Sequence, residues 1–150
     1  MRKSRRVFAL LLTAILAFTC FTPDSSGVNL QNEQGSYPTF YEIFVYSFCD
    51  SDGDGVGDLN GITSKLDYLQ ELGVGGIWLT PIHPATTYHK YDVMDYYDID
   101  PQFGTLEDFD NFMAVCQERG IAVILDLVLN HSSSMHPWFQ EAKTYLESLE

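Results

Sequence analysis

Four aspartates separated by glycines fill the stretch DSDGDGVGDLNG, residues 50 to 61. They stand at positions 1, 3, 5 and 9 of the stretch: Asp50, Asp52, Asp54 and Asp58. Gly55 follows at position 6, where a calcium loop turns sharply, and Val56 at position 7, where a backbone carbonyl points inward. A cation with six to eight oxygen ligands at about 2.3–2.6 Å neutralises carboxylates that otherwise repel one another. These offsets predict a Ca²⁺ site formed by the four carboxylates and the Val56 carbonyl.

The loop departs from an EF-hand in two respects. Position 12, where an EF-hand has a bidentate glutamate, is Gly61, and the preceding residues have the pattern of a strand and not of a helix. The sequence therefore predicts a calcium loop of another kind. The alternative is a solvated acidic turn that holds no ion.

A second polar cluster lies in TYHKYDVMDYYDIDPQFGT, residues 87 to 105. His89, Tyr91 and Asp92 fall within four residues. An aromatic ring that stacks on a pyranose, a carboxylate that accepts from hydroxyls and an imidazole donor are the groups that carbohydrate recognition needs. The cluster indicates a sugar-binding loop, and a structural loop of mutually bonded polar side chains is the alternative.

A third motif, DLVLNH, runs from Asp126 to His131 at the end of an apolar stretch. Side chains at the carboxyl end of a barrel strand project into the binding face. His131 is accordingly a candidate binding residue. A helix-capping or purely structural histidine is the alternative.

The segments around these motifs alternate between strand and helix patterns. Apolar strands are predicted at 40–48, 75–82 and 121–129, and amphipathic helices at 62–72 and 105–120. Thr105 and Asp108 resemble a capping box at the start of the second helix, and Gly73 and Gly120 are placed to end the two helices. The buried side of the second helix is predicted to comprise Leu106, Phe109, Phe112 or Met113, and Cys116.

This alternation is typical of right-handed parallel βαβ units. A doubly wound sheet and a (β/α)₈ barrel both fit it. Polar and aromatic residues crowd the segments after the strands, at 49–60, 80–104 and 130–138. In a barrel such loops share one catalytic face, and no glycine-rich phosphate fingerprint follows the first strand. We therefore predict the α/β class and favour a (β/α)₈ barrel over a doubly wound sheet.

The 150 residues begin with a basic head and an apolar run of 12 residues, Val7 to Phe18. This run is shorter than the about 20 residues that a membrane-spanning helix needs and is typical of a secretory signal. We predict a signal peptide at 1–22, a linker at 23–38 and an α/β domain at 39–150, in a secreted protein. Cleavage between Thr19 and Gly27, lipid attachment at Cys20 that anchors the protein to the cell surface, and an uncleaved membrane anchor are the alternatives.

Charge and cysteine content restrict the partners. Four of the eight Lys and Arg lie in the head and all 21 acidic residues follow it, so the remainder is strongly acidic. Such a surface repels nucleic acid and anionic lipid but is compatible with neutral substrates and divalent cations. Contact with a membrane is expected only through the signal or a lipid on Cys20. Cys49 and Cys116 do not form a disulfide framework, and Cys116 is predicted to be a small buried apolar residue.

Together the motifs resemble the α-amylase superfamily, glycoside hydrolase family 13, from about Phe40 to Ala142. DSDGDGVGDLNGI, HKYDVMDYYDIDPQFGT and DLVLNH occur in the family's order and spacing, and HPWFQEA follows. One such loop is weak evidence of membership, whereas the ordered set is strong.

The resemblance implies roles for particular residues. It places the family's calcium loop on residues 50 to 58 and its sugar-stacking tyrosine on Tyr91. It places hydroxyl-binding groups on His89, Asp92 and His131. Asp126 matches an aspartate that supports the active-site centre.

The resemblance also implies retaining chemistry on α-glucosidic bonds of starch-type glucans or maltooligosaccharides, with two carboxyl groups about 5 Å apart. No acidic residue of this sequence matches the family's nucleophile, acid/base or stabilising motifs, so no catalytic residue is assigned. The resemblance thus implies that residues 39–150 form about the first three βα units of a (β/α)₈ TIM barrel, the N-terminal portion of the family's catalytic barrel. This truncated barrel is expected to be inactive alone. Hydrolase and transglycosidase both remain open, as do a non-catalytic calcium-binding module and a silent amylase-like partner domain.

Overall fold

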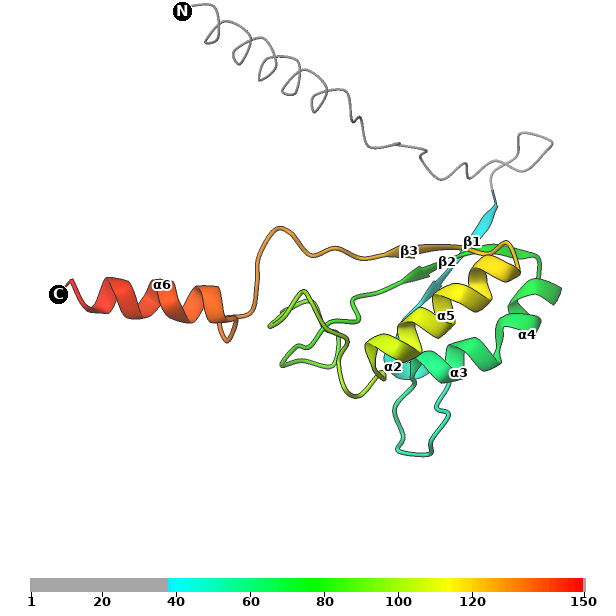
Figure 1. The fold of residues 1–150 in the computed structure, drawn as a ribbon, viewed down its shortest axis with the longest axis horizontal. Coiled ribbons are helices and arrows are strands. Elements are labelled where there is room, and N and C mark those ends of the chain that lie inside the picture. The colour runs from blue at the N-terminus through cyan, green and yellow to red at the C-terminus, as the bar shows by residue number, and fades with distance from the viewer. Residues whose placement is uncertain (1–37, 150) are drawn as a thin grey trace, which may run out of the picture. The chain divides into compact units, whose positions relative to one another are not determined.

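The computed structural model describes residues 38–149 of the chain (Figure 1). The predicted signal peptide, with Cys20, and the predicted linker up to residue 37 lie outside the described residues. Among residues 38–149, no helix is both long and apolar enough to cross a bilayer.

A three-stranded parallel sheet forms the centre of the described residues. Its strands are β1 (Thr39–Ile43), β2 (Val74–Leu79) and β3 (Ala122–Leu125), in the order β1-β2-β3. The register pairs Ile43 with Leu79 and Leu79 with Leu125, so the carboxyl ends of all three strands are level. The loops that follow the strands therefore start from one edge of the sheet, as parallel βα units require.

The helices follow the strands along the chain. They are α2 (Val45–Phe48), α3 (Leu59–Ser64), α4 (Leu66–Glu71), α5 (Leu106–Glu118) and α6 (Pro137–Glu147). In Figure 1, α3, α4 and α5 cover one face of the sheet. The core between them contains Ile77 of β2, Ile62 and Leu69 of the helix pair, and Phe112 of α5, each with 0% exposure. Burial of these apolar side chains is the main force that holds the helices against the sheet.

The first helix differs from the prediction at both ends. It begins at Leu59 because the Asp58 side chain caps it by accepting from the Gly61 amide, and it breaks at Lys65 into α3 and α4. The apolar residues at helical spacing in the predicted range are Ile62, Leu66, Leu69 and Leu72. The first three are buried, whereas Leu72 is 56% exposed because it lies at the helix end. Gly73 has φ +85, so its predicted role as the terminating glycine is confirmed.

The first predicted strand, 40–48, is wrong in its second half. The strand ends at Ile43 and the chain turns into α2. The aromatic and β-branched pattern continues past Ile43, but the neighbouring strand ends at Leu79, two residues before Pro81, and offers no further partner. The carbonyls of Tyr46 and Cys49 accept instead from the amides of residues 57 and 58, at 2.8 and 3.0 Å.

The other two strands are also shorter than predicted. β2 ends before residue 82, and β3 covers only part of the predicted 121–129 because its partner ends at Leu79. The continuous apolar run at 121–129 is typical of a strand buried on both faces, but β3 is only partly buried in the described residues. Ile124 and Leu125, which as adjacent strand residues point to opposite faces, are 41% and 38% exposed, because β3 is at the edge of the described sheet.

The second helix matches its predicted cap. The Thr105 side chain accepts from the Asp108 amide and the Asp108 carboxylate accepts from the Thr105 amide, which confirms the capping box. Phe112 and Cys116 are buried as predicted, and burial raises the pKa of the Cys116 thiol to about 11. Leu106, 50% exposed in the first turn, and Met113, 36% exposed, do not belong to the buried side.

Candidate functional site

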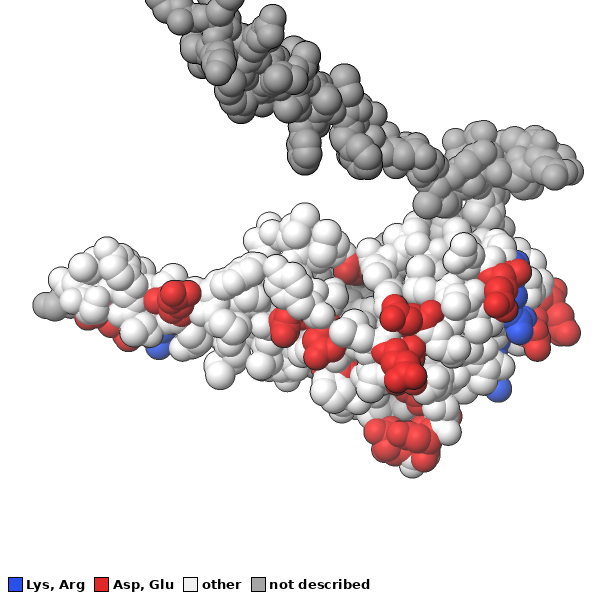
Figure 2. Space-filling model, viewed as in Figure 1, with Lys and Arg blue, Asp and Glu red and all other residues white. Residues whose placement is uncertain are grey.

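The aspartate loop between α2 and α3 brings three of its four carboxylates together. Asp50, Asp52 and Asp58 each offer an oxygen, and these oxygens lie within 4.8 Å of one another. The acidic patch at the bottom of Figure 2 lies over this loop of Figure 1. Two oxygens bound to one Ca²⁺ at about 2.3–2.6 Å are at most about 5 Å apart, so the three carboxylates fit a calcium ion.

Backbone amides help to hold the first of these carboxylates in place. Gly53 and Gly55 donate to the two oxygens of Asp50 at 2.7 and 2.9 Å, and both glycines have positive φ. These two bonds lower the pKa of Asp50 below its usual value, and the bond from Gly53 has the larger effect. The predicted sharp turn at Gly55 is therefore confirmed, and it turns the chain around the Asp50 carboxylate.

Asp54 and Asp58 play different parts in the loop. Asp54 is outside the group of converging carboxylates and accepts from the Val56 amide at 2.7 Å. Asp58 accepts from the amide and hydroxyl of Ser51 at 2.7 and 2.8 Å and from the Gly61 amide at 2.6 Å. Asp58 thus joins the candidate ion site to the start of α3, a link that its loop position alone did not indicate.

The loop after β2 carries the predicted sugar-binding residues on a narrow turn. An antiparallel bridge between Ala85 and Val93 closes the turn at its base. Next to this bridge, both oxygens of Asp92 accept from the amides and hydroxyls of Thr86 and Thr87. Burial opposes ionisation of Asp92, but the two hydroxyl bonds outweigh it and lower the pKa to about 2. Asp92 therefore stabilises the turn, because most of the lone pairs of its carboxylate accept hydrogen bonds from Thr86 and Thr87.

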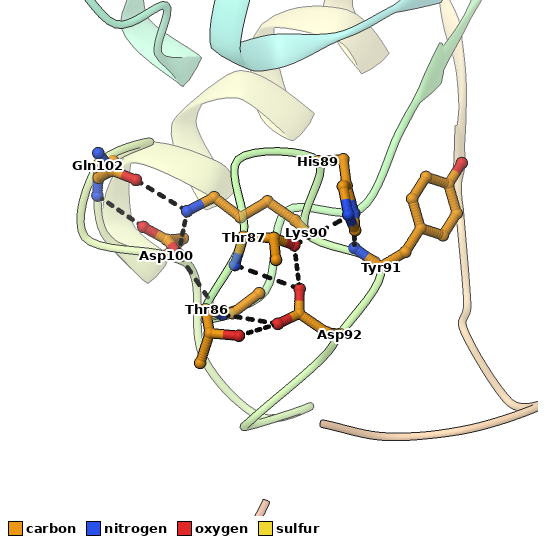
Figure 3. A network of polar contacts seen from close by, with 9 residues as sticks. Thr86, Thr87, His89, Lys90, Tyr91, Asp92, Asp100 and Gln102 are labelled. Atoms are coloured by element: carbon orange, nitrogen blue, oxygen red, sulfur yellow. Dashed lines mark hydrogen bonds and ion pairs between the residues drawn. The ribbon is translucent and has the colours of Figure 1, made fainter. Parts of the chain in front are cut away.

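Lys90 is a residue of this turn that the sequence analysis did not single out. Its backbone has φ +62, the left-handed region that costs a non-glycine residue about 1–2 kcal/mol. Its side chain is buried, and its ammonium lies 2.7 Å from Asp100 Oδ2 and 2.8 Å from Gln102 Oε1 (Figure 3). A lysine in a polar loop is ordinarily solvated, so the sequence carried no signal for this ion pair.

Tyr91 connects this turn to the third strand. Its hydroxyl donates to Asp126 Oδ2 at 2.5 Å, and Trp78 Nε1 on β2 donates to the other Asp126 oxygen at 2.8 Å. The Tyr91 side chain is nonetheless 39% exposed, so its ring remains accessible. Asp126 thus helps to orient the Tyr91 side chain. No sequence pattern indicated Trp78, the other residue that donates to Asp126.

The bond to Asp126 changes the titration of Tyr91. That bond, with smaller contributions from burial and from the charges of Asp126 and Glu42, raises the pKa of Tyr91 from 10.0 to about 12. The protonated phenol is the form that the fold favours. The stability that the Tyr91–Asp126 bond contributes is therefore complete below pH 10 and is lost as the pH rises from 10 through about 12.

The two predicted histidines occupy different surroundings. His89 lies beside Tyr91, with ring centres 6.0 Å apart, and its Nδ1 accepts from the Tyr91 amide at 3.2 Å, which leaves Nε2 as the donor of the neutral ring. His131 is exposed and lines a hollow of about 490 Å³ with aromatic and apolar side chains, among them Tyr96, Leu129 and Trp138. The structure thus brings His89, Tyr91 and Asp92 together on one turn and places His131 in this neighbouring hollow.

Comparison with known proteins identifies a family. Residues 42–149 match the family described as "Alpha amylase, catalytic domain". The chain is 56% identical over 108 residues to the alpha-amylase SusG of Bacteroides thetaiotaomicron, covering 72% of this chain and 16% of that protein. It is 60% identical over 100 residues to Alpha-amylase 3 of Dictyoglomus thermophilum, covering 67% and 20%.

A solved structure gives the same result. Amy13B of Eubacterium rectale superposes with a TM-score of 0.76 at 54% identity, covering 80% of this chain and 24% of that one. The chain therefore spans about a fifth of the length of the proteins it matches. The likeness includes all three motifs at residues 50 to 131 that the sequence analysis singled out.

Proposed function

The chain belongs to the α-amylase catalytic-domain family, and we propose that it forms part of an exported glycoside hydrolase that acts on α-glucosidic bonds of starch-type glucans by a retaining mechanism. Its three parallel strands belong, in this proposal, to a (β/α)₈ barrel. The exposed apolar side chains Ile124 and Leu125 on β3 support this, because they would be covered by further strands and helices.

The observation that carries the proposal is the setting of Tyr91. An accessible phenol ring, held at its hydroxyl by Asp126 and flanked by the His89 imidazole, lies beyond the carboxyl ends of β2 and β3. A fixed aromatic face next to a ring N–H donor suits a pyranose, which presents C–H groups on its face and hydroxyls at its edge. The related alpha-amylases named above support α-glucan as the substrate class.

The residues of this chain bind and orient the sugar in the proposed mechanism. Tyr91 provides the stacking surface, and His89 and His131 donate to hydroxyls. The Asp92 carboxylate, engaged by Thr86 and Thr87, acts mainly by holding the turn. Holding a ring at a fixed position lowers the barrier because orientation is established before reaction. Retaining cleavage needs two carboxyl groups about 5 Å apart, and we assign neither role to a residue of this chain.

We also propose that the aspartate loop binds Ca²⁺. Asp50, Asp52 and Asp58 supply the converging oxygens, and Asp54 and the Val56 carbonyl complete the predicted set. A bound divalent ion supplies charge neutralisation and cross-links the loop to the start of α3. Export rests on the predicted signal at 1–22.

Replacing Tyr91 by alanine is expected to lower kcat/KM on maltooligosaccharides by at least about tenfold, or about 1.4 kcal/mol, because the stacking surface is lost. The assay is release of reducing sugar by the protein expressed from its native gene. Tyr68→Ala is the matched control, since Tyr68 is 53% exposed on α4. Unchanged kinetics for Tyr91→Ala would show that the sugar binds elsewhere.

The polypeptide of residues 1–150 by itself is expected to release no reducing sugar from maltooligosaccharides. None of its acidic residues matches the family's catalytic motifs, and the sheet of its described part has three strands where a closed barrel has eight. Measurable release by the purified 150-residue chain, absent from a mock preparation, would contradict this expectation.

A further inference from the structure

The turn that carries Tyr91 contains a buried ion pair that the proposed function does not use. Lys90 and Asp100 have side chains 3% and 7% exposed, with Nζ and Oδ2 2.7 Å apart. The ammonium also donates to Gln102 Oε1 at 2.8 Å and lies 5.2 Å from the centre of the Phe103 ring. Asp100 itself is fixed by the Gln102 amide at 3.0 Å.

The ion pair and the sugar-facing residues lie on opposite sides of the turn. In Figure 3 the Lys90 side chain extends toward Asp100 and Gln102, whereas the Tyr91 ring points away from them. The positive φ of Lys90 permits this divergence between adjacent side chains. The left-handed conformation is unfavourable for lysine, so another interaction must hold it.

Both neighbours of Tyr91 in the sequence are anchored, whereas its own side chain is accessible. Asp92 is bonded to Thr86 and Thr87 on one flank, and Lys90 is bonded to Asp100 on the other. Within residues 38–149, the Tyr91 side chain makes one hydrogen bond, to Asp126. The direction of its ring therefore depends both on the bond to Asp126 and on the anchored backbone on either side.

We propose that the Lys90–Asp100 ion pair is a positioning device that holds the turn in the conformation that presents His89 and Tyr91 to the substrate. The importance of this position for catalysis rests on the proposed sugar-binding role of Tyr91. Stability alone does not call for an ion pair here, because replacing a buried pair by neutral groups of similar volume is often neutral or stabilising. An ion pair does fix the direction of the Lys90 side chain, because its ammonium must reach the Asp100 carboxylate.

The test follows the Tyr91 hydroxyl by NMR in the protein expressed from its native gene, with ¹³C at Cζ of tyrosine and Tyr91→Phe for assignment. In the unaltered protein the Tyr91 pKa is expected at about 12, set by Asp126 and, more weakly, by Glu42. Asp100→Asn keeps the size and the acceptor oxygen but removes the charge. It is expected to move the Tyr91 pKa by about one unit or more toward 10, because the hydroxyl leaves Asp126.

A second variant separates positioning from stability. Lys90→Met/Asp100→Asn leaves no unpaired buried charge and is expected to melt close to the unaltered protein. The proposal predicts that its Tyr91 pKa still moves toward 10. A Tyr91 pKa that stays at about 12 in this folded double variant would overturn the proposal. Lys143→Met is the control, because it removes an exposed ion pair on α6, with Glu147 at 3.7 Å, and should leave the Tyr91 pKa unchanged.

Sugar binding provides a separate result. With Tyr91 displaced, the KM for maltooligosaccharide should rise by about tenfold in the double variant, and Tyr91→Ala in the same background should add little. If the Tyr91 pKa moves but KM does not, the positioning role stands and the sugar-binding role of Tyr91 fails. If neither moves, the positioning role fails.

Discussion

Gly61→Ala is expected to lower the free energy of unfolding by about 3 kcal/mol or more. A Cβ on Gly61 would lie 1.9 Å from the Cys49 carbonyl oxygen, a backbone atom. That carbonyl accepts from the Asp58 amide at 3.0 Å, and the Gly61 amide donates to the Asp58 carboxylate at 2.6 Å. The clash therefore forces apart the segment after α2 and the start of α3, and it displaces one of the candidate calcium ligands.

The measurement is denaturant unfolding of the protein expressed from its native gene, followed by far-UV circular dichroism. Asn60→Ala is the control one residue away. Asn60 is exposed and loses only its bond to Asp108, at 3.0 Å, so a loss below about 1 kcal/mol is expected. Equal unfolding free energies for Gly61→Ala and Asn60→Ala would show that the close approach between Gly61 and Cys49 does not exist in the folded protein.

Calcium is expected to stabilise the protein by about 2.7 kcal/mol when its free concentration is 100 times the dissociation constant. In the proposed site the ion would stabilise the folded state, which brings oxygens of Asp50, Asp52 and Asp58 within 4.8 Å of one another. Thermal unfolding with added Ca²⁺ and with chelator measures the effect. A Tm that is indifferent to both would contradict the assignment.

Two matched variants show which carboxylates bind the ion. Asp52 and Asp54 each accept one amide bond from the residue two positions ahead, at 3.0 and 2.7 Å. Of these two residues, Asp52 belongs to the converging group and Asp54 does not. Asp52→Asn should therefore weaken Ca²⁺ binding by at least about tenfold, and Asp54→Asn should weaken it less, in a calorimetric titration. The reverse order would contradict the structure's arrangement of the loop.

The elements that sequence predicted well are those governed by local chemistry. The capping box at Thr105 and Asp108, the terminating glycine at 73 and the sharp turn at Gly55 each depend on a few adjacent residues. Strand lengths depend on the neighbouring strand, which sequence periodicity does not contain. That is why the apolar runs after Ile43 and Leu125 were predicted as strand although β2 ends at Leu79 and offers no partner.

The candidate sites show the same division. Spacing identified the aspartate loop, but only the fold shows that Asp54 stands apart and that Asp58 caps α3. Residue types and the family resemblance predict that Tyr91 is a sugar platform. The groups that hold it, Trp78 with Asp126 and Lys90 with Asp100, lie far from one another in sequence or have no distinctive pattern. Long-range partners of this kind follow from tertiary packing and not from local spacing.

The most direct test of the account is a crystal structure of the protein expressed from its native gene, grown with a non-hydrolysable maltooligosaccharide analogue. We expect a glucose ring stacked on the face of Tyr91, with a hydroxyl of that ring within hydrogen-bond distance of His89 Nε2 or His131. A well-ordered sugar bound away from the carboxyl edge of β2 and β3, with the Tyr91 ring uncovered, would contradict the account.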